Sequence, residues 1–573
     1  MISQGLQELV LCPGSRSAPL AIAAGCLAEQ DAIRLHTAID ERSAAFLALG
    51  LATGSGSPTA VITTSGSAVA NLLPAAVEAD RSCQPLLLLT ADRPQRLKNC
   101  GANQTVNQED FLAPVCRWVG SGPLSGLDQL DSTALVDLAQ AAWSCSLQTF
   151  SAAPGPVHLN LPFEEPLHPS LEDQEQVDVA GLQQTVEGLI QPSGSTTVAV
   201  TNEPGPCLDP AKPGVVVAGP WRGLATARPG FQTALQRWCQ ATGWPVLADP
   251  LAAVPDDCPG CVASWELMLD SWTPPDELQV LRLGPLPASR RLERWLQRLK
   301  GDQVLVSEGE PRSLDPLAKA KQSSAGLEHW IQQQTLHMAE SIRQAAATAA
   351  AVPGRELESF LDRELSLEGP VTEPALARGL ARLLPAERAV MLAASSPVRD
   401  WLTWSGSSPG SSRGSRPCFS FRGASGLDGT LSLAMGLSLA KGPLVLVCGD
   451  LALLHDSNGW LHATQHRPPL LVVLIDNAGG GIFQQLTLPV TPAKRFERLF
   501  AMPQAVNPLA LAAAHGIPTR QISCLEDLDA ALAWGLALSD NGPVLLRVCT
   551  DAGHDASLRQ RLRISAQNAL LSD

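Results

Sequence analysis

The sequence predicts an α/β protein made of three doubly wound parallel-sheet domains. Three observations predict this fold class. Short apolar runs rich in β-branched residues alternate with stretches of helical length along the chain. The length of 573 residues is too great for a single core. A hydrophobic fraction of 45% beside only 17% charged residues is typical of a well-buried globular protein.

Charge and hydropathy argue against several classes of function. The net charge of -15 argues against nucleic acid as the main partner, because neutralising phosphates requires a basic surface. No uninterrupted apolar run reaches the roughly 18 residues of a membrane span, so we expect no membrane insertion. The amino terminus lacks the basic start and apolar stretch of a signal peptide. We therefore expect a cytoplasmic enzyme.

The first domain, residues 1–165, shows the alternation of strands and helices most clearly. The predicted strands are 9–12, 35–39, 60–64, 86–90 and 157–161, and the predicted helices are 18–29, 42–52, 67–79 and 132–147. Polar segments follow the first four strands, at 13–17, 40–42, 65–68 and 92–94, the last continued by 100–104. Any one of them could be an ordinary helix cap. Because parallel strands end at one edge of a sheet, their combination predicts a site there.

Two further domains follow a linker. Residues 166–205 are rich in Glu, Gln, Pro, Ser and Thr, which is typical of a linker. The central domain, 206–350, has predicted strands at 215–218, 246–248, 280–283 and 304–307. It lacks a G-x-G-x-x-G sequence, so nothing in it indicates a nicotinamide or flavin dinucleotide. The third domain, 355–573, has a predicted helix at 373–384 and predicted strands at 390–394, 444–447, 470–475 and 544–548.

Fourteen cysteines raise the question of disulfides or a zinc site. Only Cys258-Pro-Gly-Cys261 has the spacing of metal ligands, and a zinc ribbon requires a second such pair. We predict reduced thiols without a metal role.

The stretch 447–483 organises the third domain. Two apolar runs, 444–447 and 470–475, bracket a segment of helical length, which predicts a βαβ unit. Asp450 and Asn477 then fall just past the carboxyl ends of two parallel strands, where open α/β sheets bind ligands. Their oxygen atoms suit a magnesium ion that also holds phosphate. The glycines at 479–481 allow the backbone to approach a diphosphate closely.

This stretch resembles the thiamine diphosphate motif, GDG followed by a spacer and NN. Gly449-Asp450 matches its start, and Asn477 follows the Asp by twenty-seven residues. Leu451 and Asp476 depart from the pattern. Asp476 would add a negative charge near the diphosphate. The motif implies that Asp450, Asn477 and the Gly479 carbonyl hold Mg²⁺ or Mn²⁺.

Over nearly its full length the chain also resembles the 2-succinyl-5-enolpyruvyl-6-hydroxy-3-cyclohexene-1-carboxylate synthases, the thiamine diphosphate enzymes of menaquinone and phylloquinone biosynthesis. The runs that carry this resemblance are 13–17, 40–42, 64–71, 89–94, 100–104, 422–429 and 479–483. It implies that the first domain binds the pyrimidine of the cofactor and the third its diphosphate. The cofactor would lie between two subunits of a homodimer or a dimer of dimers. The family's reaction decarboxylates 2-oxoglutarate and adds the succinyl carbanion to isochorismate.

The resemblance also implies roles for individual residues. Glu41 matches the glutamate that hydrogen-bonds to the pyrimidine and promotes its imino tautomer; alternatively, it only favours the dipole of a helix that begins there. Leu427 would hold the cofactor in a bent form; alternatively, it is a core leucine. The other implied cofactor contacts are Ser65, Gly66, Gly449, Asp450, Asn477, Gly479, Gly480, Gly481 and Ile482.

Both implied substrates are dicarboxylates, so a locally basic site is expected within an acidic protein. Arginine is suited to bidentate recognition of carboxylates. For Arg290 and Arg291 the alternative is the solvated start of a helix. The implied substrate-binding residues are Ser15, Arg16, Arg93, Gln104, Arg290, Arg291, Ser395, Arg399, Arg422, Ile482 and Phe483.

Two other functions remain open from the sequence. One is a different thiamine diphosphate enzyme, such as a 2-oxoacid decarboxylase or carboligase. The other is a catalytically inactive scaffold with the same fold. The set of arginines argues against the first, and the presence of Glu41, Asp450 and Asn477 argues against the second.

Overall fold

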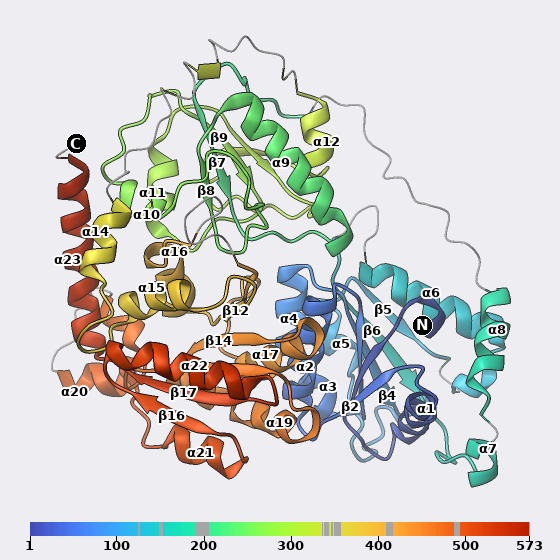
Figure 1. Cartoon of the computed structure of the whole chain (residues 1–573). Coiled ribbons are helices and arrows are strands. Elements are labelled where there is room, and N and C mark those ends of the chain that lie inside the picture. Colours follow the sequence, from blue (N-terminus) through green and yellow to red (C-terminus); the bar gives the residue numbers. More distant parts are fainter. Residues whose placement is uncertain are drawn as a thin grey trace. The chain divides into compact units, whose positions relative to one another are not determined.

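The computed structural model of the chain describes residues 1–123, 126–147, 153–175, 177–189, 205–334, 336, 343–344, 348, 357–407, 416–485 and 493–571. These residues form three sheets of parallel strands with helices between most successive strands (Figure 1). The strand orders are β2-β1-β3-β4-β6-β5, β11-β10-β9-β7-β8 and β13-β12-β14-β15-β17-β16. In each sheet the order reverses direction after the first strands, as in doubly wound folds. The predicted fold class is confirmed.

The first sheet contains all five strands predicted in its part of the sequence. Its strands are β1 (Glu8–Leu11), β2 (Arg34–Thr37), β3 (Thr59–Thr63), β4 (Leu86–Asp92), β5 (Trp118–Ser121) and β6 (Pro156–Pro162). Its helices are η1 (Ile2–Gln4), α1 (Ala18–Glu29), α2 (Glu41–Ser55), α3 (Ser67–Ala70), α4 (Leu73–Ser82), η2 (Gln95–Leu97), α5 (Glu109–Leu112), η3 (Leu127–Gln129) and α6 (Ser132–Leu147). The prediction of a single helix over 67–79 is wrong, because this segment contains two helices, α3 and α4. Pro74, at the start of α4, has no N–H to continue a helix from α3.

The segment predicted as a linker contains regular structure. Helices α7 (Leu171–Glu175) and α8 (Val179–Leu189) lie within it. The side chain of Gln30 donates to the carbonyl of Val177 at 2.9 Å and accepts from the Val179 N–H at 3.2 Å. The part of this segment that the structure describes is therefore attached to α1 at its end.

Buried tryptophan side chains pack against the second sheet. Its strands are β7 (Gly214–Ala218), β8 (Val246–Ala248), β9 (Gln279–Leu283), β10 (Gln303–Val306) and β11 (Ala320–Ser323). Its helices are η4 (Ala225–Ala227), α9 (Arg228–Thr242), α10 (Trp265–Met268), α11 (Arg290–Arg298) and α12 (Leu327–Gln332). The ring of Trp238 on α9 lies 5.2 Å from that of Trp244 and 5.1 Å from that of Trp330. These buried rings fix α9 and α12 on one face of the sheet.

The third sheet contains, as neighbouring strands, the segments 444–447 and 470–475 that the sequence predicted as the two parallel strands of a βαβ unit. Its strands are β12 (Ala389–Leu392), β13 (Cys418–Ser420), β14 (Leu444–Gly449), β15 (Leu470–Asp476), β16 (Thr519–Ile522) and β17 (Val544–Cys549). Its helices are α14 (Leu357–Glu364), α15 (Glu373–Leu383), α16 (Ser396–Trp404), α17 (Thr430–Lys441), α18 (Asp450–His455), η5 (Ser457–Trp460), α19 (Leu461–His466), η6 (Gly481–Gln485), α20 (Ala493–Phe496), η7 (Glu497–Ala501), α21 (Pro508–Ala514), η8 (Leu525–Asp527), α22 (Leu528–Ser539) and α23 (Ala552–Leu571). No helix in the described part of the chain is long and apolar enough to cross a lipid bilayer.

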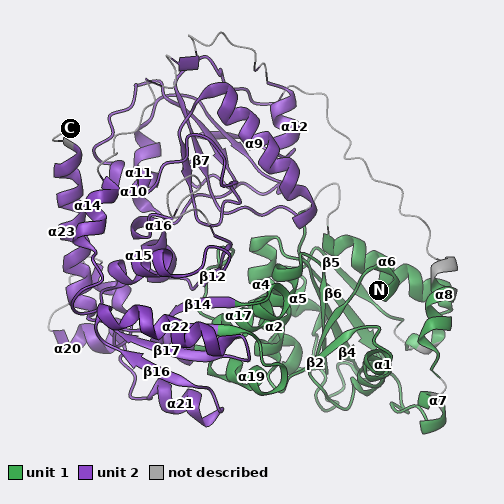
Figure 2. Ribbon diagram, in the orientation of Figure 1, with its two compact units in different colours: residues 1–199, 421–443, 455–470 green, residues 200–420, 444–454, 471–573 purple. Residues whose placement is uncertain are grey.

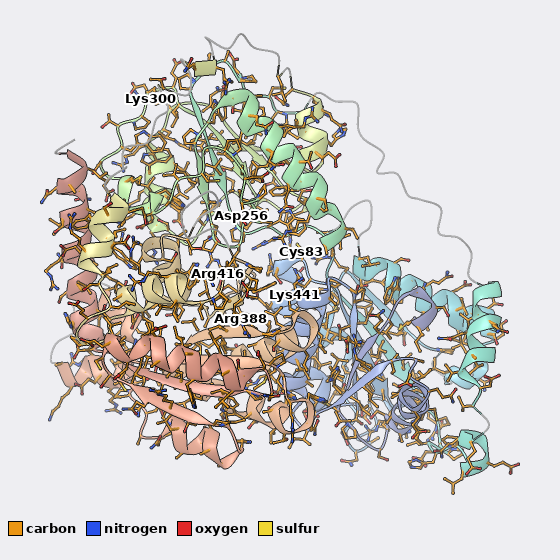
Figure 3. The ribbon with its side chains drawn as sticks, in the orientation of Figure 1. Cys83, Asp256, Lys300, Arg388, Arg416 and Lys441 are labelled. Atoms are coloured by element: carbon orange, nitrogen blue, oxygen red, sulfur yellow. The ribbon has the colours of Figure 1, made fainter. Side chains whose placement is uncertain are left out.

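A buried arginine closes the carboxyl end of α15. The guanidinium of Arg416 (Figure 3) donates to the carbonyls of Ala381 at 2.8 Å, Leu384 at 3.3 Å and Pro385 at 2.9 Å. The last carbonyls of a helix have no partner within it, and a cation there also complements the helix dipole. Arg416 therefore fixes the end of α15, whose other end carries Glu373.

The described residues divide into two compact units (Figure 2). Unit 1 comprises residues 1–199, 421–443 and 455–470, and unit 2 comprises 200–420, 444–454 and 471–573. Within unit 1, helix α2 packs along α17 (Figure 1). The two backbones approach so closely that a Cβ on Gly50 would lie 2.2 Å from the Leu433 carbonyl oxygen. One on Gly436 would lie 2.0 Å from that of Leu47. Only glycine permits this contact.

The interior of the first sheet contains a histidine that resists protonation. His158 on β6 is fully buried, and its Nε2 lies 2.8 Å from Thr90 Oγ1 on β4. Burial lowers the pKa of His158 to about 4. The unfolded chain takes up a proton near pH 6.5, whereas the folded chain does not until about pH 4. Stability is therefore lost as the pH falls through this window.

We predict that His158→Gln reduces this loss. Between pH 7 and 4 the free energy of unfolding should fall by up to roughly 3 kcal/mol more in the wild type than in the variant. The reason is that the variant lacks the imidazole whose pKa is 6.5 in the unfolded chain and about 4 in the folded chain. Urea unfolding at several pH values measures the difference. His554→Gln, at an exposed position, is the control and should leave the pH dependence unchanged. Identical pH profiles for wild type and His158→Gln would contradict the prediction.

Candidate active site at the strand ends

Asp450 and the turn after β15 lie together in unit 2. Asp450 begins α18 directly after β14, and β15 is the next strand of the sheet. The buried Asp450 carboxylate accepts the Gly479 N–H at 2.7 Å through Oδ2 and the Leu451 N–H at 2.8 Å through Oδ1. The predicted juxtaposition of the two strand ends is thus present.

The side chain of Asn477 has one satisfied end and one unsatisfied end. Its Nδ2 donates to Glu373 Oε1 at 2.7 Å. Its Oδ1 is buried and accepts no hydrogen bond from the described residues. A buried acceptor without a partner is costly unless a ligand completes it. Together with the Asp450 carboxylate, which binds the same turn at Gly479, this oxygen fits a hard cation such as Mg²⁺.

The turn that follows Asn477 requires glycine. Gly479 has a φ of 115°, and a Cβ there would lie 2.0 Å from the Ala501 carbonyl oxygen. A Cβ on Gly481 would lie 2.4 Å from Asn477 Nδ2. The Gly479 carbonyl oxygen accepts the Gly481 N–H at 2.8 Å, and its second lone pair can accept from or coordinate a further group. A side chain at either position would displace Asn477 or the turn.

Burial perturbs the acids of this edge. It raises the pKa of Asp450 to about 6, with a further contribution from the charge of Asp476. It also raises the pKa of Glu373 to about 7, against the opposing charge of Arg559. A cation bound by Asp450 would favour the ionised carboxylate.

The negative charge of Asp476, which departs from the cofactor motif, is partly offset within the sheet. Its Oδ2 accepts from Arg547 Nε at 2.8 Å and from Arg547 Nη2 at 2.7 Å. Arg547 lies on β17, which pairs with β15. Both donors bind the one oxygen, whereas Oδ1 accepts the Ala478 N–H at 3.3 Å in the turn after β15, so Arg547 offsets part of the charge that Asp476 adds near Asp450.

In unit 1, Glu41 lies at the first position of α2. Asp40 caps this helix, accepting the N–H groups of Arg42 at 2.9 Å and Ser43 at 3.3 Å. Its second oxygen accepts from Asn458 Nδ2 at 2.9 Å. The half-buried carboxylate of Glu41 accepts from Asn71 Nδ2 at 3.4 Å. The sequence Asp40-Glu41-Arg42 thus caps a helix and also presents a carboxylate.

Arg42 connects this helix start to the loop that precedes α17. Its guanidinium donates to the His455 carbonyl at 2.8 Å and lies 3.8 Å from Asp428 Oδ1. Leu427, next to Asp428, is 37% exposed. Leu427 is therefore not a core leucine, and it lies at the same end of the α2–α17 pair as Glu41.

A buried acid of α4, Glu78, accepts hydrogen bonds from the backbone of the loop 422–427. Glu78 Oε1 accepts the Gly423 N–H at 2.8 Å, and Oε2 accepts those of Ala424 at 2.7 Å and Ser425 at 3.2 Å. Three backbone hydrogen bonds to one carboxylate order the loop between Arg422 and Leu427.

Four of the predicted residues of the first domain form one cluster. Ser65 and Gln104 exchange two hydrogen bonds, from Ser65 Oγ to the Gln104 carbonyl at 3.3 Å and from Gln104 Nε2 to the Ser65 carbonyl at 2.8 Å. Gly66 lies against them, because a Cβ on it would be 2.9 Å from Gln104 Cγ. Arg93 donates to the same Gln104 carbonyl at 2.9 Å.

A second arginine stands near this cluster. Burial lowers the pKa of Arg93, and the positive charge of Arg16 lowers it further. Arg16 donates to the Phe163 carbonyl at 2.9 Å and pairs with Glu165 at 3.4 Å. Ser15, adjacent to it, is exposed. Two neighbouring guanidinium groups therefore concentrate positive charge at this edge.

The remaining predicted residues lie on other elements. Arg399 is an exposed residue of α16 and donates to the carbonyl of Ser395, the helix cap. Ile482 and Phe483 are half-buried in η6, and the Phe483 ring packs 5.6 Å from that of Phe500. Gly449 ends β14. Arg290 and Arg291 begin α11, beside a different sheet from Asp450, and Arg291 forms an ion pair with Asp270 at 2.5 Å.

Comparison with known proteins shows to which family the chain belongs. Three family models match: "Thiamine pyrophosphate enzyme, N-terminal TPP binding domain" over 1–111, "Middle domain of thiamine pyrophosphate" over 210–392 and "Thiamine pyrophosphate enzyme, C-terminal TPP binding domain" over 408–548. A 2-succinyl-5-enolpyruvyl-6-hydroxy-3-cyclohexene-1-carboxylate synthase of Synechococcus sp. (strain CC9605) is 62% identical over 99% of this chain and 97% of its own length. The chain belongs to this synthase family.

Other relatives agree. A synthase of the same name from Synechococcus sp. (strain CC9902) is 59% identical over 99% of both chains. One from Prochlorococcus marinus (strain MIT 9313) is 56% identical over 98% of this chain and 97% of its own length. The fold also resembles a thiamin diphosphate-dependent enzyme from Mycobacterium smegmatis, with a TM-score of 0.64 and 17% identity over 96% of this chain and 97% of that one. The synthases are thiamine diphosphate enzymes, and the resemblance inferred from the motifs is confirmed.

Three buried acids that contact segments carrying predicted site residues, or helices next to them, were absent from the sequence prediction. They are Glu78, Glu373 and Asp456. Buried Asp456 accepts the Ser432 N–H at 2.7 Å near the start of α17. The available signals were weak. Glu78 is an acid among the buried alanines of α4, and Glu373 follows the cap Thr372, which predicts only the start of a helix.

We predict that Asp450→Ala weakens the joint binding of Mg²⁺ and thiamine diphosphate to this synthase. Removing a residue that only hydrogen-bonds to a metal ligand typically lowers metal affinity roughly 10–100-fold. The decrease in affinity should be larger here, because a charged ligand itself is removed. Calorimetry with and without Mg²⁺ measures it. Asp450→Asn retains an acceptor for the Gly479 N–H and separates loss of charge from loss of the hydrogen bond. Unchanged cofactor affinity in both variants would disprove the assignment.

Proposed function

We propose that this chain catalyses the thiamine diphosphate-dependent decarboxylation of 2-oxoglutarate and the addition of the succinyl unit to isochorismate. The product, 2-succinyl-5-enolpyruvyl-6-hydroxy-3-cyclohexene-1-carboxylate, is a precursor of menaquinone and phylloquinone. The observation that carries the cofactor assignment is the unsatisfied Asn477 Oδ1 in the turn whose Gly479 N–H donates to the Asp450 carboxylate. The substrate assignment is supported by full-length identity to synthases of this name.

The divalent cation belongs to the proposal. Asp450, Asn477 Oδ1 and the Gly479 carbonyl would hold Mg²⁺ or Mn²⁺, since all three offer oxygen ligands. Amide groups of the glycine turn would face the diphosphate. The pairing of Asp476 with Arg547 would offset part of the repulsion between this acid and the phosphates.

The first-domain residues would act on the other end of the cofactor. When bound, thiamine diphosphate supplies a nucleophilic thiazolium carbon whose activation depends on its own aminopyrimidine. Glu41 would share a proton with a pyrimidine nitrogen, because its carboxylate is half-buried and has one weak partner, Asn71 at 3.4 Å. Leu427 would support the bent cofactor, in agreement with its exposure. Ser65 and Gly66 would line the pyrimidine pocket.

Substrate carboxylates would be received by arginine. Arg16 and Arg93 approach each other in unit 1, where an anion relieves their repulsion. Arg422 and Arg399 would contribute from the loop before α17 and from α16, with Ser15, Gln104, Ser395, Ile482 and Phe483 as neighbours. Arg290 and Arg291 stay a prediction, although Arg291 has Asp270 as a partner.

The assembly and location complete the proposal. A homodimer or a dimer of dimers would bring the first domain of one subunit to the third domain of another. The domain bounds 1–165, 206–350 and 355–573 each enclose one of the three sheets. The homodimer and the cytoplasmic location stay predictions.

The product assay tests the reaction. We expect the protein with Mg²⁺ and thiamine diphosphate to convert isochorismate and 2-oxoglutarate into a product whose mass equals their sum minus carbon dioxide. Mass spectrometry detects it. Succinic semialdehyde alone would indicate a simple 2-oxoacid decarboxylase, and no product would indicate an inactive scaffold.

In the same assay, Glu41→Gln should lose about a hundredfold or more of turnover, the usual contribution of an acid–base group. It should still bind the cofactor, because its amide preserves size and hydrogen bonding. Asp40→Asn is the matched control: it changes the neighbouring carboxylate and retains a cap acceptor for α2. Near-normal turnover of Glu41→Gln would assign activation to another residue.

We predict that Arg422→Ala and Arg399→Ala each reduce kcat/KM for one of the two acids. Losing a charge-assisted hydrogen bond costs roughly 1.5–3 kcal/mol, or about ten- to a hundredfold. Lysine should restore only part, since it cannot form the two-pronged contact. Steady-state kinetics with each acid varied measures the effect.

The control is Arg388→Ala, because Arg388 (Figure 3) forms a surface pair with Asp540 at 3.4 Å. Its constants should match the wild type. If Arg422→Ala and Arg399→Ala also keep wild-type constants for both acids, the two arginines have structural roles.

A further inference from the structure

The orientation of Asn477 has a cause in unit 2. An ionised carboxylate only accepts hydrogen bonds, so it selects the NH₂ end of a neighbouring carboxamide. Glu373 Oε1 lies 2.7 Å from Asn477 Nδ2, and Asn477 Oδ1 is therefore directed to the opposite side. We propose that Glu373 is a positioning residue that presents Asn477 Oδ1 to the divalent cation. This inference rests on the proposed metal site.

Glu373 is itself held from several sides. Its Oε2 accepts from Arg559 Nη2 on α23 at 2.5 Å, and its N–H donates to Asp555 Oδ1 at 3.0 Å. Arg559 is fixed by Asp400, through Nε at 2.9 Å and Nη2 at 2.5 Å. Since all four charged residues are buried, the carboxylate of Glu373 has little freedom to rotate. Its two oxygens have separate partners, the amide and the guanidinium.

Stability alone does not account for this cluster. Three buried carboxylates, Glu373, Asp400 and Asp555, surround the single guanidinium of Arg559. Such groups lose hydration, and buried ion pairs are often no more stabilising than apolar residues of the same volume. Burial raises the pKa of Asp555 to about 6 against the opposing charge of Arg559, and the charge of Asp400 adds to the increase. Glu373 is the acid of this cluster that contacts a proposed metal ligand.

The effect of Glu373→Gln follows from donor and acceptor geometry. The Gln Oε1 should turn toward Arg559, because a charged donor forms the stronger bond. Its Nε2 then faces Asn477, whose amide must reverse to accept from it. The reversed Asn477 presents NH₂ to the cation, which repels it. Altered orientation of a metal ligand typically costs 10–100-fold in metal affinity.

The test uses the full chain with thiamine diphosphate and Mn²⁺ at pH 8.5, which keeps the carboxylates ionised. Free Mn²⁺ is measured by its electron paramagnetic resonance signal. Glu373→Gln should weaken Mn²⁺ binding about 10–100-fold, while the melting temperature without Mn²⁺ stays close to that of the wild type. Glu373→Asp preserves the charge but shortens the reach, and it should also weaken binding at least about tenfold. Asp540→Asn, which removes an exposed surface carboxylate that pairs with Arg388 outside this cluster, is the control and should bind within about threefold of the wild type.

A second pair of variants tests the contact directly. In Glu373→Gln, the further change Asn477→Asp supplies an acceptor for the Gln Nε2 and leaves an oxygen for the cation. In the wild-type background, Asn477→Asp instead places two carboxylates against each other. The change should therefore be at least about tenfold more favourable for Mn²⁺ binding in the Glu373→Gln background. Equal effects in both backgrounds would overturn the proposal.

The remaining outcomes are distinguishable. If Asp450→Ala leaves Mn²⁺ binding intact, the metal site itself is wrong. If Asp450→Ala abolishes binding while Glu373→Gln and Glu373→Asp retain wild-type affinity, only the positioning role fails. If Glu373→Asp retains affinity and Glu373→Gln loses it, charge rather than orientation is responsible, and the proposal is overturned. If Glu373→Gln does not fold, the Glu373→Asp result decides.

Discussion

The close contact between α2 and α17 determines the geometry of unit 1. Glycines at positions 50 and 436 remove the Cβ atoms that would otherwise meet the opposite backbone at distances of 2.2 and 2.0 Å. The two helix starts are then joined by Arg42, which contacts both His455 and Asp428. As a result, Glu41 and Leu427, the residues proposed to contact the pyrimidine and to support the cofactor, lie at one end of one helix pair. A larger residue at either glycine would separate them.

In unit 2 the corresponding constraint is electrostatic. Buried acids lie beneath the edge where a dication and a diphosphate would meet, and each has a defined partner. Asp476 is paired with Arg547, Glu373 is divided between Asn477 and Arg559, and Asp450 accepts backbone N–H groups. Burial raises the pKa of both Asp450 and Glu373, so the edge without a cation is electrostatically unfavourable. A bound dication would supply positive charge there, which is a physical argument for the proposed metal site.

The sequence predicted the interiors of the sheets better than their edges. The strands β5, β11, β13 and β16 were missed, and each lies at the edge of its sheet. They are short and partly exposed, so they lack the continuous apolar run that marks a buried parallel strand. The site was predictable where it consists of motifs at strand ends. Its supporting acids were not, because their partners are distant: 104 residues separate Glu373 from Asn477, and 186 separate it from Arg559.

Local pairing of like charges explains how an acidic protein can recognise dicarboxylates. A net charge of -15 gives long-range repulsion, but screening limits it to about 8 Å at physiological salt. At shorter range the neighbouring Arg16 and Arg93 dominate, and Arg16 is balanced by a surface pair with the exposed Glu165. In the proposed site, a substrate carboxylate would relieve the repulsion between the two guanidinium groups and replace this weak surface pair. Repulsion between like charges in the free protein thus contributes to the binding free energy of an anion, and this contribution is larger for a dianion than for a neutral analogue.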